Sequence, residues 1–270
     1  MIAPSAGPDS LLERAEQATE SGQTPEAIEL YGLILEADPA HDVARNNLGC
    51  LLIQLRRFAE AVAVLEERSG PDTPTVLQGN LGYALLNQGE LSRAEAVFRT
   101  VLDTEPGDGA ARNHLGMVLL RRGLIPDATR EFQRVVRENP RHREAWNNLG
   151  CAHESGGDLQ QARAAFREAL KVDPFSVDAH NNLGCVLRDL GQLSEGLEEL
   201  KIAISLEPEN PSIHRNLGLT YHRLGDASQA RSHLRRYLRY RLEDDHFPEV
   251  RRLLEELGHE GSAETTKDDS

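Results

Sequence analysis

The chain has 270 residues, with 30 lysines and arginines against 44 acidic residues, and its formal net charge is −14. This balance argues against a nucleic-acid surface, because binding to phosphates needs clustered positive charge. The first ten residues show no signal-peptide pattern and no run of about 18 apolar residues occurs, so we expect a cytoplasmic protein that makes no contact with a membrane.

A Leu-Gly dipeptide recurs at a nearly constant spacing. Its copies begin at residues 48, 81, 115, 149, 183 and 217, so successive steps are 33, 34, 34, 34 and 34 residues. A fixed period of about 20–50 residues is typical of a solenoid, in which each repeat packs against its neighbours. The pattern predicts one elongated domain.

Each repeat contains two helical patterns, as residues 143–176 illustrate. The first pattern ends at Gly156-Gly157, since glycine commonly follows a helix terminus. The second pattern ends before Pro174, which cannot continue a helix. The residues on the two apolar stripes are Trp146, Leu149, Gly150, Ala162, Phe166 and Ala169. One helical hairpin cannot bury both stripes, so copies must stack.

Two positions of the second helix also recur. The small one is Ala27, Ala61, Ala94, Ala128, Ala162 and Ala230, with Gly196 as the exception. The bulky one, four residues later, is Tyr31, Leu65, Phe98, Phe132, Phe166, Leu200 and Leu234. A proline closes five of the repeats, at Pro39, Pro106, Pro140, Pro174 and Pro208. Together these recurring positions resemble the tetratricopeptide repeat. The resemblance implies an all-α, right-handed superhelical solenoid of about seven helical hairpins and a C-terminal capping helix.

The chain divides as follows in sequence order. Residues 1–7 are expected to be a flexible N-terminus, 8–258 the solenoid, and 259–270 a disordered tail. The expected repeats are 8–41, 42–74, 75–108, 109–142, 143–176, 177–210 and 211–244, and the capping helix is 247–258, with Gly258 as its stop. In the second repeat Arg56 stands at the inter-helix glycine position, and residues 69–74 predict an irregular loop.

The two residues before each Leu-Gly pair are expected to lie on the side of the first helix away from the packing stripe. These candidate site residues are Asn46, Asn47, Asn80, Asn113, His114, Asn147, Asn148, Asn181, Asn182, Arg215 and Asn216. An asparagine amide both donates and accepts hydrogen bonds, which suits pairing with a peptide backbone. The alternative is that they are consensus residues of the repeat, or that they cap neighbouring helix groups between repeats.

A second resemblance bears on these asparagines. Tetratricopeptide domains of the O-linked N-acetylglucosamine transferase kind carry an asparagine ladder in a concave groove, and Asn148 and Asn182 match it. This resemblance implies a groove that binds peptide. The carboxylate clamp of chaperone adaptors is not matched, because its lysine positions hold Asn46, Gly79, Asn113, Asn147, Asn181 and Arg215.

No catalytic, metal-binding or cofactor motif occurs. Cys50, Cys151 and Cys185 stand in separate repeats and are expected to be small apolar filler. His180 and His214, at the position of Trp146, are expected to be packing residues.

We therefore expect a non-enzymatic scaffold without cofactor or metal that binds an extended segment of a protein or peptide partner. The alternatives are a regulatory subunit of an enzyme complex and a structural piece that assembles through its ends. Eight acidic residues against one arginine give the first repeat a charge of −7, and seven arginines against one aspartate give residues 211–242 a charge of +6. We expect a monomer, with weak head-to-tail self-association between these oppositely charged ends as the alternative.

Overall fold

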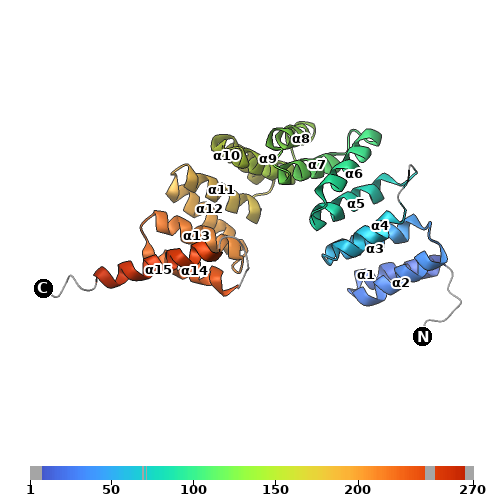
Figure 1. The fold of residues 1–270 in the computed structure, drawn as a ribbon, viewed down its shortest axis with the longest axis horizontal. Helices are drawn as coiled ribbons and strands as arrows, with labels where there is room; N and C mark the ends of the chain where they lie inside the picture. The colour runs from blue at the N-terminus through green and yellow to red at the C-terminus, as the bar shows by residue number, and fades with distance from the viewer. Residues whose placement is uncertain (1–7, 69, 71, 241–246, 265–270) are drawn as a thin grey trace. The chain divides into compact units, whose positions relative to one another are not determined.

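The structure is a computed structural model that describes residues 8–68, 70, 72–240 and 247–264 (Figure 1). These residues form fifteen α-helices and no β-strand. Consecutive helices pair into seven hairpins, and the fifteenth helix follows the last pair. The predicted all-α fold of seven hairpins and a terminal helix is confirmed.

The helices follow the predicted repeats closely. The first helices of the hairpins are α1 (Pro8–Glu20), α3 (Asp42–Gln54), α5 (Thr75–Gln88), α7 (Gly109–Arg121), α9 (Arg143–Ser155), α11 (Val177–Asp189) and α13 (Pro211–Arg223). The second helices are α2 (Thr24–Ala37), α4 (Phe58–Glu66), α6 (Leu91–Thr104), α8 (Ile125–Glu138), α10 (Leu159–Val172), α12 (Leu193–Leu206) and α14 (Ala227–Arg239). The terminal helix is α15 (Phe247–Glu264).

The chain divides into two compact units, which we describe separately. Unit 1 covers residues 1–131 and unit 2 covers residues 132–270. In unit 1, α5 contacts both α3 and α7. In unit 2, α11 contacts both α9 and α13. The first helices of successive repeats therefore lie side by side within each unit.

Five of the hairpins show a close approach between the glycine of the Leu-Gly pair and the bulky residue of the second helix. A Cβ atom added to Gly150 would lie 2.5 Å from Cε1 of Phe166, closer than two carbon atoms can approach. The same relation holds for Gly49 with Leu65, Gly82 with Phe98, Gly184 with Leu200, and Gly218 with Leu234. In these five hairpins glycine allows the two helices to pack more closely than a residue with a Cβ atom would.

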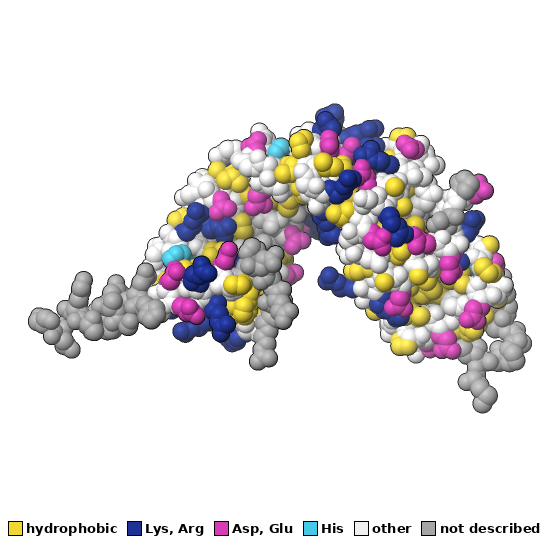
Figure 2. All heavy atoms as spheres, viewed as in Figure 1, with side chains coloured by type: hydrophobic (Ala, Val, Ile, Leu, Met, Phe, Trp, Pro, Cys, Tyr) yellow, Lys and Arg dark blue, Asp and Glu magenta, His cyan; other side chains and the backbone are white. Residues whose placement is uncertain are grey.

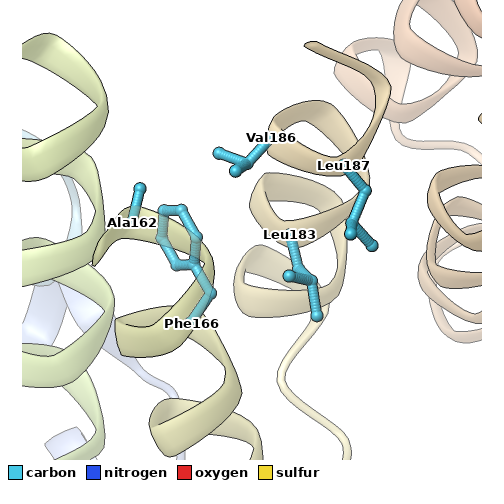
Figure 3. Packing of buried hydrophobic residues seen from close by; sticks show 5 residues of the cluster. All are labelled: Ala162, Phe166, Leu183, Val186 and Leu187. Carbon is cyan, nitrogen blue, oxygen red and sulfur yellow. The ribbon is translucent and has the colours of Figure 1, made fainter. Parts of the chain in front are cut away.

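The bulky residue also joins one repeat to the next. Phe166 is fully buried and forms a cluster with Ala162 of its own helix and with Leu183, Val186 and Leu187 of α11. Figure 3 shows the α10 side chains facing those of α11. One aromatic ring therefore fills the space within a hairpin and the space between hairpins.

Gly196, the exception at the small position, has a structural reason. A Cβ atom at this position would lie 2.8 Å from the carbonyl oxygen of Gly184 and 3.1 Å from the backbone nitrogen of Arg188. These are backbone atoms of α11, which cannot swing aside as a side chain can. The helices α11 and α12 therefore leave no room for alanine at position 196.

We expect Gly196→Ala to destabilise the protein. Alanine inside a helix normally adds about 0.5–1 kcal/mol of stability over glycine. At position 196 overpacking against the α11 backbone should exceed this gain, with a net loss of about 1–2 kcal/mol. Urea unfolding followed by circular dichroism measures the change. The control is Gly32→Ala in α2, where an added Cβ meets nothing within 4 Å and stability should rise; equal effects of the two substitutions would contradict the packing described.

The turn between the two helices of a hairpin requires a left-handed backbone. Glycine supplies it in six repeats, at Gly22, Gly89, Gly123, Gly157, Gly191 and Gly225, with φ from 73° to 89°. In the second repeat Arg56 adopts φ 59°, the one positive value among the described non-glycine residues. The turn of the second repeat therefore has the same left-handed backbone as the turns of the other repeats, although the Cβ atom of Arg56 disfavours that conformation.

Arg56→Gly should therefore stabilise the protein. A left-handed conformation costs a residue with a Cβ about 1–2 kcal/mol, and the greater freedom of glycine in the unfolded chain cancels about 0.5–1 kcal/mol of the gain. The expected increase in the free energy of unfolding is about 0.5–1 kcal/mol. The matched control is Arg56→Ala, which removes the same side chain but keeps the Cβ atom and hence the strain. An Arg56→Gly protein no more stable than Arg56→Ala would show that the turn is unstrained.

The second repeat also ends irregularly, as predicted. Its second helix α4 has 9 residues, whereas α2 and α6 have 14. Gly70 and residues 72–74 are not helical, and Ser69 and Pro71 lie outside the described residues. The predicted irregular loop is confirmed for the part of the segment that the structure describes.

The terminal helix caps the last repeat but is longer than predicted. Val250 and Leu257 of α15 are buried against Ala230, Leu234 and Tyr237 of α14. The prediction that Gly258 ends this helix is wrong, because α15 continues to Glu264. Glycine inside a helix costs only about 1 kcal/mol relative to alanine, so Gly258 weakens the helix without ending it.

Two predictions fall on the ends of the chain. The flexible N-terminus, 1–7, lies outside the described residues, as does the part of the predicted tail from 265 to 270. Among the described helices none is both long and apolar enough to cross a bilayer.

Candidate functional site

The candidate residues lie on the first helices of six repeats. Asn46 and Asn47 are on α3, Asn80 on α5, Asn113 and His114 on α7, Asn147 and Asn148 on α9, Asn181 and Asn182 on α11, and Arg215 and Asn216 on α13. We call the surface they form in each unit the ladder face. Most of these side chains are half-buried. Asn113 and Asn216 are only 5% and 4% exposed, so the expectation that all of them lie away from the core is wrong for these two.

In unit 2 the asparagines form a continuous string of hydrogen bonds. Asn216 Nδ2 donates to Asn181 Oδ1 at 2.8 Å, and Asn181 Nδ2 donates to Asn182 Oδ1 at 3.4 Å. Asn182 Nδ2 then donates to Asn147 Oδ1 at 3.2 Å. Each bond points from a later repeat toward an earlier one, or along one helix. The string therefore connects α13, α11 and α9 through side-chain amides.

Unit 1 carries the same string. Asn80 Nδ2 donates to Asn46 Oδ1 at 2.8 Å, and Asn46 Nδ2 lies 3.5 Å from Asn47 Oδ1. Asn47 Nδ2 donates to Glu16 Oε1 of α1 at 3.3 Å. The order of positions and the direction of the bonds match those in unit 2. The asparagines thus bond one another's side chains between repeats, and Asn47 bonds Glu16, whereas the alternative interpretation of the sequence was that they cap helix groups.

A cavity of about 320 Å³ lies where the unit 1 string ends. Its lining includes Glu16, Glu20, Asn47, Cys50 and Gln54, which come from α1 and α3. The Tyr31 hydroxyl, almost fully buried, lies 3.4 Å from Thr19 Oγ1 at the base of the same cavity. The ladder face is therefore hollowed and acidic at the first repeat.

The string is interrupted where Gly79 replaces the asparagine of the third repeat. In the fourth repeat, His114 occupies the position directly before the Leu-Gly pair, where the second, third, fifth, sixth and seventh repeats have asparagine. Its ring contacts Tyr83, with ring centroids 5.0 Å apart, and Phe98 at 5.4 Å. His114 therefore makes ring contacts with both helices of the third repeat, α5 and α6.

The cysteines line the ladder face as neutral thiols. Cys50 accepts a bond from Asn80 at 3.3 Å, and Cys151 accepts one from Asn182 at 3.7 Å. Burial raises the pKa of Cys151 to about 12 and that of Cys185 to about 11. A thiol with so high a pKa is a poor nucleophile and a poor metal ligand near neutral pH. Within the described part of the chain, no three His, Cys, Asp or Glu side chains form a metal-binding group.

A second recurring bond, which sequence reasoning missed, lies at the start of five of the first helices. Trp146 Nε1 donates to the carbonyl oxygen of Pro140 at 2.9 Å. The same bond joins Arg45, Arg112, His180 and His214 to Pro39, Pro106, Pro174 and Pro208, respectively. We call it the proline contact. Its signal in the sequence is a side chain with an N–H group six residues after each closing proline.

The last repeat adds a pair of histidines to its proline contact. His214 Nε2 donates to the Pro208 carbonyl, so Nδ1 of the neutral ring is an acceptor, and His233 Nδ1 lies 3.0 Å from it. His214 is 1% exposed, as expected for a packing residue. Burial and the nearby Arg236 and Arg239 lower the pKa of His214. Burial and the adjacent His214 lower the pKa of His233 to about 4.

Stability should fall as the pH drops from about 6.5 toward 4. Both histidines have a lower pKa in the folded protein than in the unfolded chain, so the unfolded chain binds protons first in this window. Their stabilising effect is complete above pH ~6.5 and is lost on acidification. Urea unfolding at pH 7 and pH 5 measures the loss. His233→Gln should reduce the difference between the two pH values; an unchanged difference would exclude this pair as its source.

Comparison with known proteins gives a consistent result. A family model described as tetratricopeptide repeat matches residues 80–129, 119–179 and 149–200, and another of that description matches 18–73. A third model, described as TPR repeat, matches residues 184–225. A comparison with curated protein sequences found no match.

Solved structures share the fold at low sequence identity. A tetratricopeptide repeat protein from Parabacteroides merdae ATCC 43184 is 14% identical, with a TM-score of 0.74 over 93% of this chain and 98% of that chain. The APC/C hetero-tetramer Cut9-Hcn1 is 17% identical, with a TM-score of 0.72 over 92% of this chain and 55% of that chain. A thermophilic TPR protein in Thermus thermophilus, TTC0263, is 24% identical, with a TM-score of 0.57 over 68% of this chain and 98% of that chain.

Proposed function

Because the chain belongs to the tetratricopeptide repeat family, we propose that it is a non-enzymatic scaffold whose ladder face holds an extended segment of a partner protein. The fold of this family is a protein–protein interaction module. The proposal that the partner binds on the ladder face rests on the asparagine strings. The same strings join neighbouring repeats within each unit.

The strings support binding because they orient the amides without using all of their hydrogen-bonding capacity. An asparagine side chain has two N–H donors and an oxygen with two lone pairs. Within the described residues, Asn147 accepts a bond from Asn182 and donates none, so both of its N–H groups remain for a ligand. Asn181 donates one bond and accepts one, which leaves one N–H group and one lone pair. Half-buried, fixed amides with unused groups suit an extended main chain, which offers both N–H and C=O groups.

The amides are also held in place before any partner arrives. A free asparagine side chain loses rotational entropy when it binds, and this loss weakens binding. Here each amide is already fixed by a neighbour in the string, so little further ordering is needed. The repetition along α9, α11 and α13 places such groups at the repeat spacing, which favours a long segment over a compact ligand.

The predicted self-association between the oppositely charged ends remains a prediction. Arg231 of the last repeat is less available for it than the sequence suggested, because it donates to the Leu257 carbonyl of α15 at 2.8 Å. No observation favours the regulatory or end-assembly alternatives over binding on the ladder face.

The test separates the binding role of Asn147 from its structural role. Asn147→Asp keeps the oxygen that accepts the Asn182 bond but replaces the free NH₂ group by a second oxygen. The protein should stay folded and lose about 1–3 kcal/mol of affinity for a bound segment, as expected when a hydrogen bond to a ligand is lost. The probe is an unstructured peptide selected from a display library on the full chain, and calorimetry gives its affinity.

The control is Gln160→Glu, which makes the same chemical change on an exposed residue of α10. It should leave the affinity of the peptide unchanged. If both variants bind the selected peptide as tightly as the original chain, the ladder face is not the binding surface. If both weaken binding equally, the effect is one of net charge and the proposal is likewise contradicted.

A further inference from the structure

The last repeat carries positive charge that no carboxylate among the described residues neutralises. Arg235, Arg236 and Arg239 lie in the last turns of α14 and are exposed. None of them forms an ion pair with any carboxylate that the structure describes, although arginines elsewhere in the chain commonly do, as Arg57 does with Glu60. Figure 2 shows dark blue basic side chains gathered over the region of α13 and α14. In a chain with a net charge of −14, a group of arginines without an ion-pair partner among the described carboxylates is unusual.

Two of these arginines border a cavity. It has a volume of about 300 Å³ and is lined by Glu209, His214, Arg236, Arg239 and Tyr240. Glu209 comes from the connection between α12 and α13, and His214 from the first turn of α13. None of the candidate residues of the ladder face lines it. The cavity is therefore a separate feature of the surface.

The walls of the cavity are already fixed by contacts within the protein. His214 lines the cavity and is held through both ring nitrogens, by the Pro208 carbonyl and by His233. The Tyr240 ring stacks on His214, with ring centroids 6.5 Å apart, and its hydroxyl donates to Glu209 at 2.5 Å. Glu209 is thus engaged by Tyr240, while the guanidinium groups of Arg236 and Arg239 are not engaged by any described carboxylate.

We propose that this cavity binds an oxyanion, of the kind that a phosphorylated or acidic side chain of a partner protein carries. Two guanidinium groups at positions i and i+3 of one helix share a face and can hold one anion between them. Arginine forms paired, charge-assisted hydrogen bonds with phosphate and carboxylate oxygens. The C-terminal end of a helix repels anions, so the arginines and not the helix backbone supply the attraction.

The residues that line the cavity also limit the size and charge of the ligand that it can bind. The engaged carboxylate of Glu209 disfavours a large polyanion, because a second negative group would lie beside it. The rings of His214 and Tyr240 offer no further donor, since the N–H group of His214 bonds the Pro208 carbonyl and the O–H group of Tyr240 bonds Glu209. The site therefore suits one compact anionic group at the end of a side chain.

The experiment is a titration of the isotope-labelled full chain with inorganic phosphate, followed by nuclear magnetic resonance at constant ionic strength. Saturable shifts should appear for residues 209–214 and 236–240. A parallel titration with acetate distinguishes the two sources: stronger binding of phosphate assigns a phosphorylated side chain, and stronger binding of acetate assigns an acidic one. The absence of saturable shifts with both anions overturns the proposal.

Variants test whether the two arginines hold the anion. Arg236→Gln with Arg239→Gln should weaken binding about ten-fold or more, since two charge-assisted contacts are lost. Arg235→Gln removes the same charge from the neighbouring position, which does not line the cavity, and should change binding by less than about two-fold. Arg236→Lys with Arg239→Lys should recover only part of the affinity, because lysine keeps the charge without the paired donors.

The outcome that excludes the site is equal weakening by Arg235→Gln and by either cavity variant. That result would show attraction to the general positive charge of α14. All of the altered residues are exposed, so the variants should fold, and circular dichroism checks this. Failure of this proposal leaves the ladder face untouched, because the two tests share no residue.

Discussion

The contact of one glycine with one bulky side chain is the constraint on which the rest of the structure depends. Where Gly150 meets Phe166, the two helices of a hairpin approach until no Cβ would fit between them. The ring of Phe166 then reaches past its own hairpin to Leu183 and Val186 of the next one. Because the interior of a protein is densely packed, this single contact sets both the hairpin and the stacking of hairpins. The spacing of the ladder face follows from it, since the asparagines sit one and two residues before the Leu-Gly pair.

The sequence predicted this framework well because its signals are periodic and local. Leu-Gly pairs, small residues and closing prolines gave the number and order of the hairpins. The helix ends were less predictable. Gly258 looks like a stop, but a glycine can also lie inside a helix, and α15 continues past it. Gly196 looked like a simple departure from alanine, and only the backbone of α11 beside it shows that alanine cannot fit.

The candidate site was predicted by position but not by its bonds. Helix angle placed the asparagines on one face, yet the bond from Asn182 to Asn147 depends on how two repeats are stacked, which one sequence does not state. The burial of Asn216 depends in the same way on its neighbours. The proline contact was missed because its side chains share no residue type: tryptophan, histidine and arginine have in common only an N–H group at the right distance. A cavity such as that beside Arg236 needs three segments to meet, and no local pattern reports it.

The short sequence span of the bonds that join repeats has a consequence for how this chain folds during its synthesis. Among the described residues, the asparagine bonds between repeats span at most 35 residues and the proline contact spans six. A repeat leaving the ribosome therefore needs only the following one to complete its contacts. Domains whose strands pair across the whole sequence must wait for their last residues, and their apolar surfaces stay exposed meanwhile. Here the exposed surface during synthesis never exceeds that of one growing end, whatever the number of repeats already made.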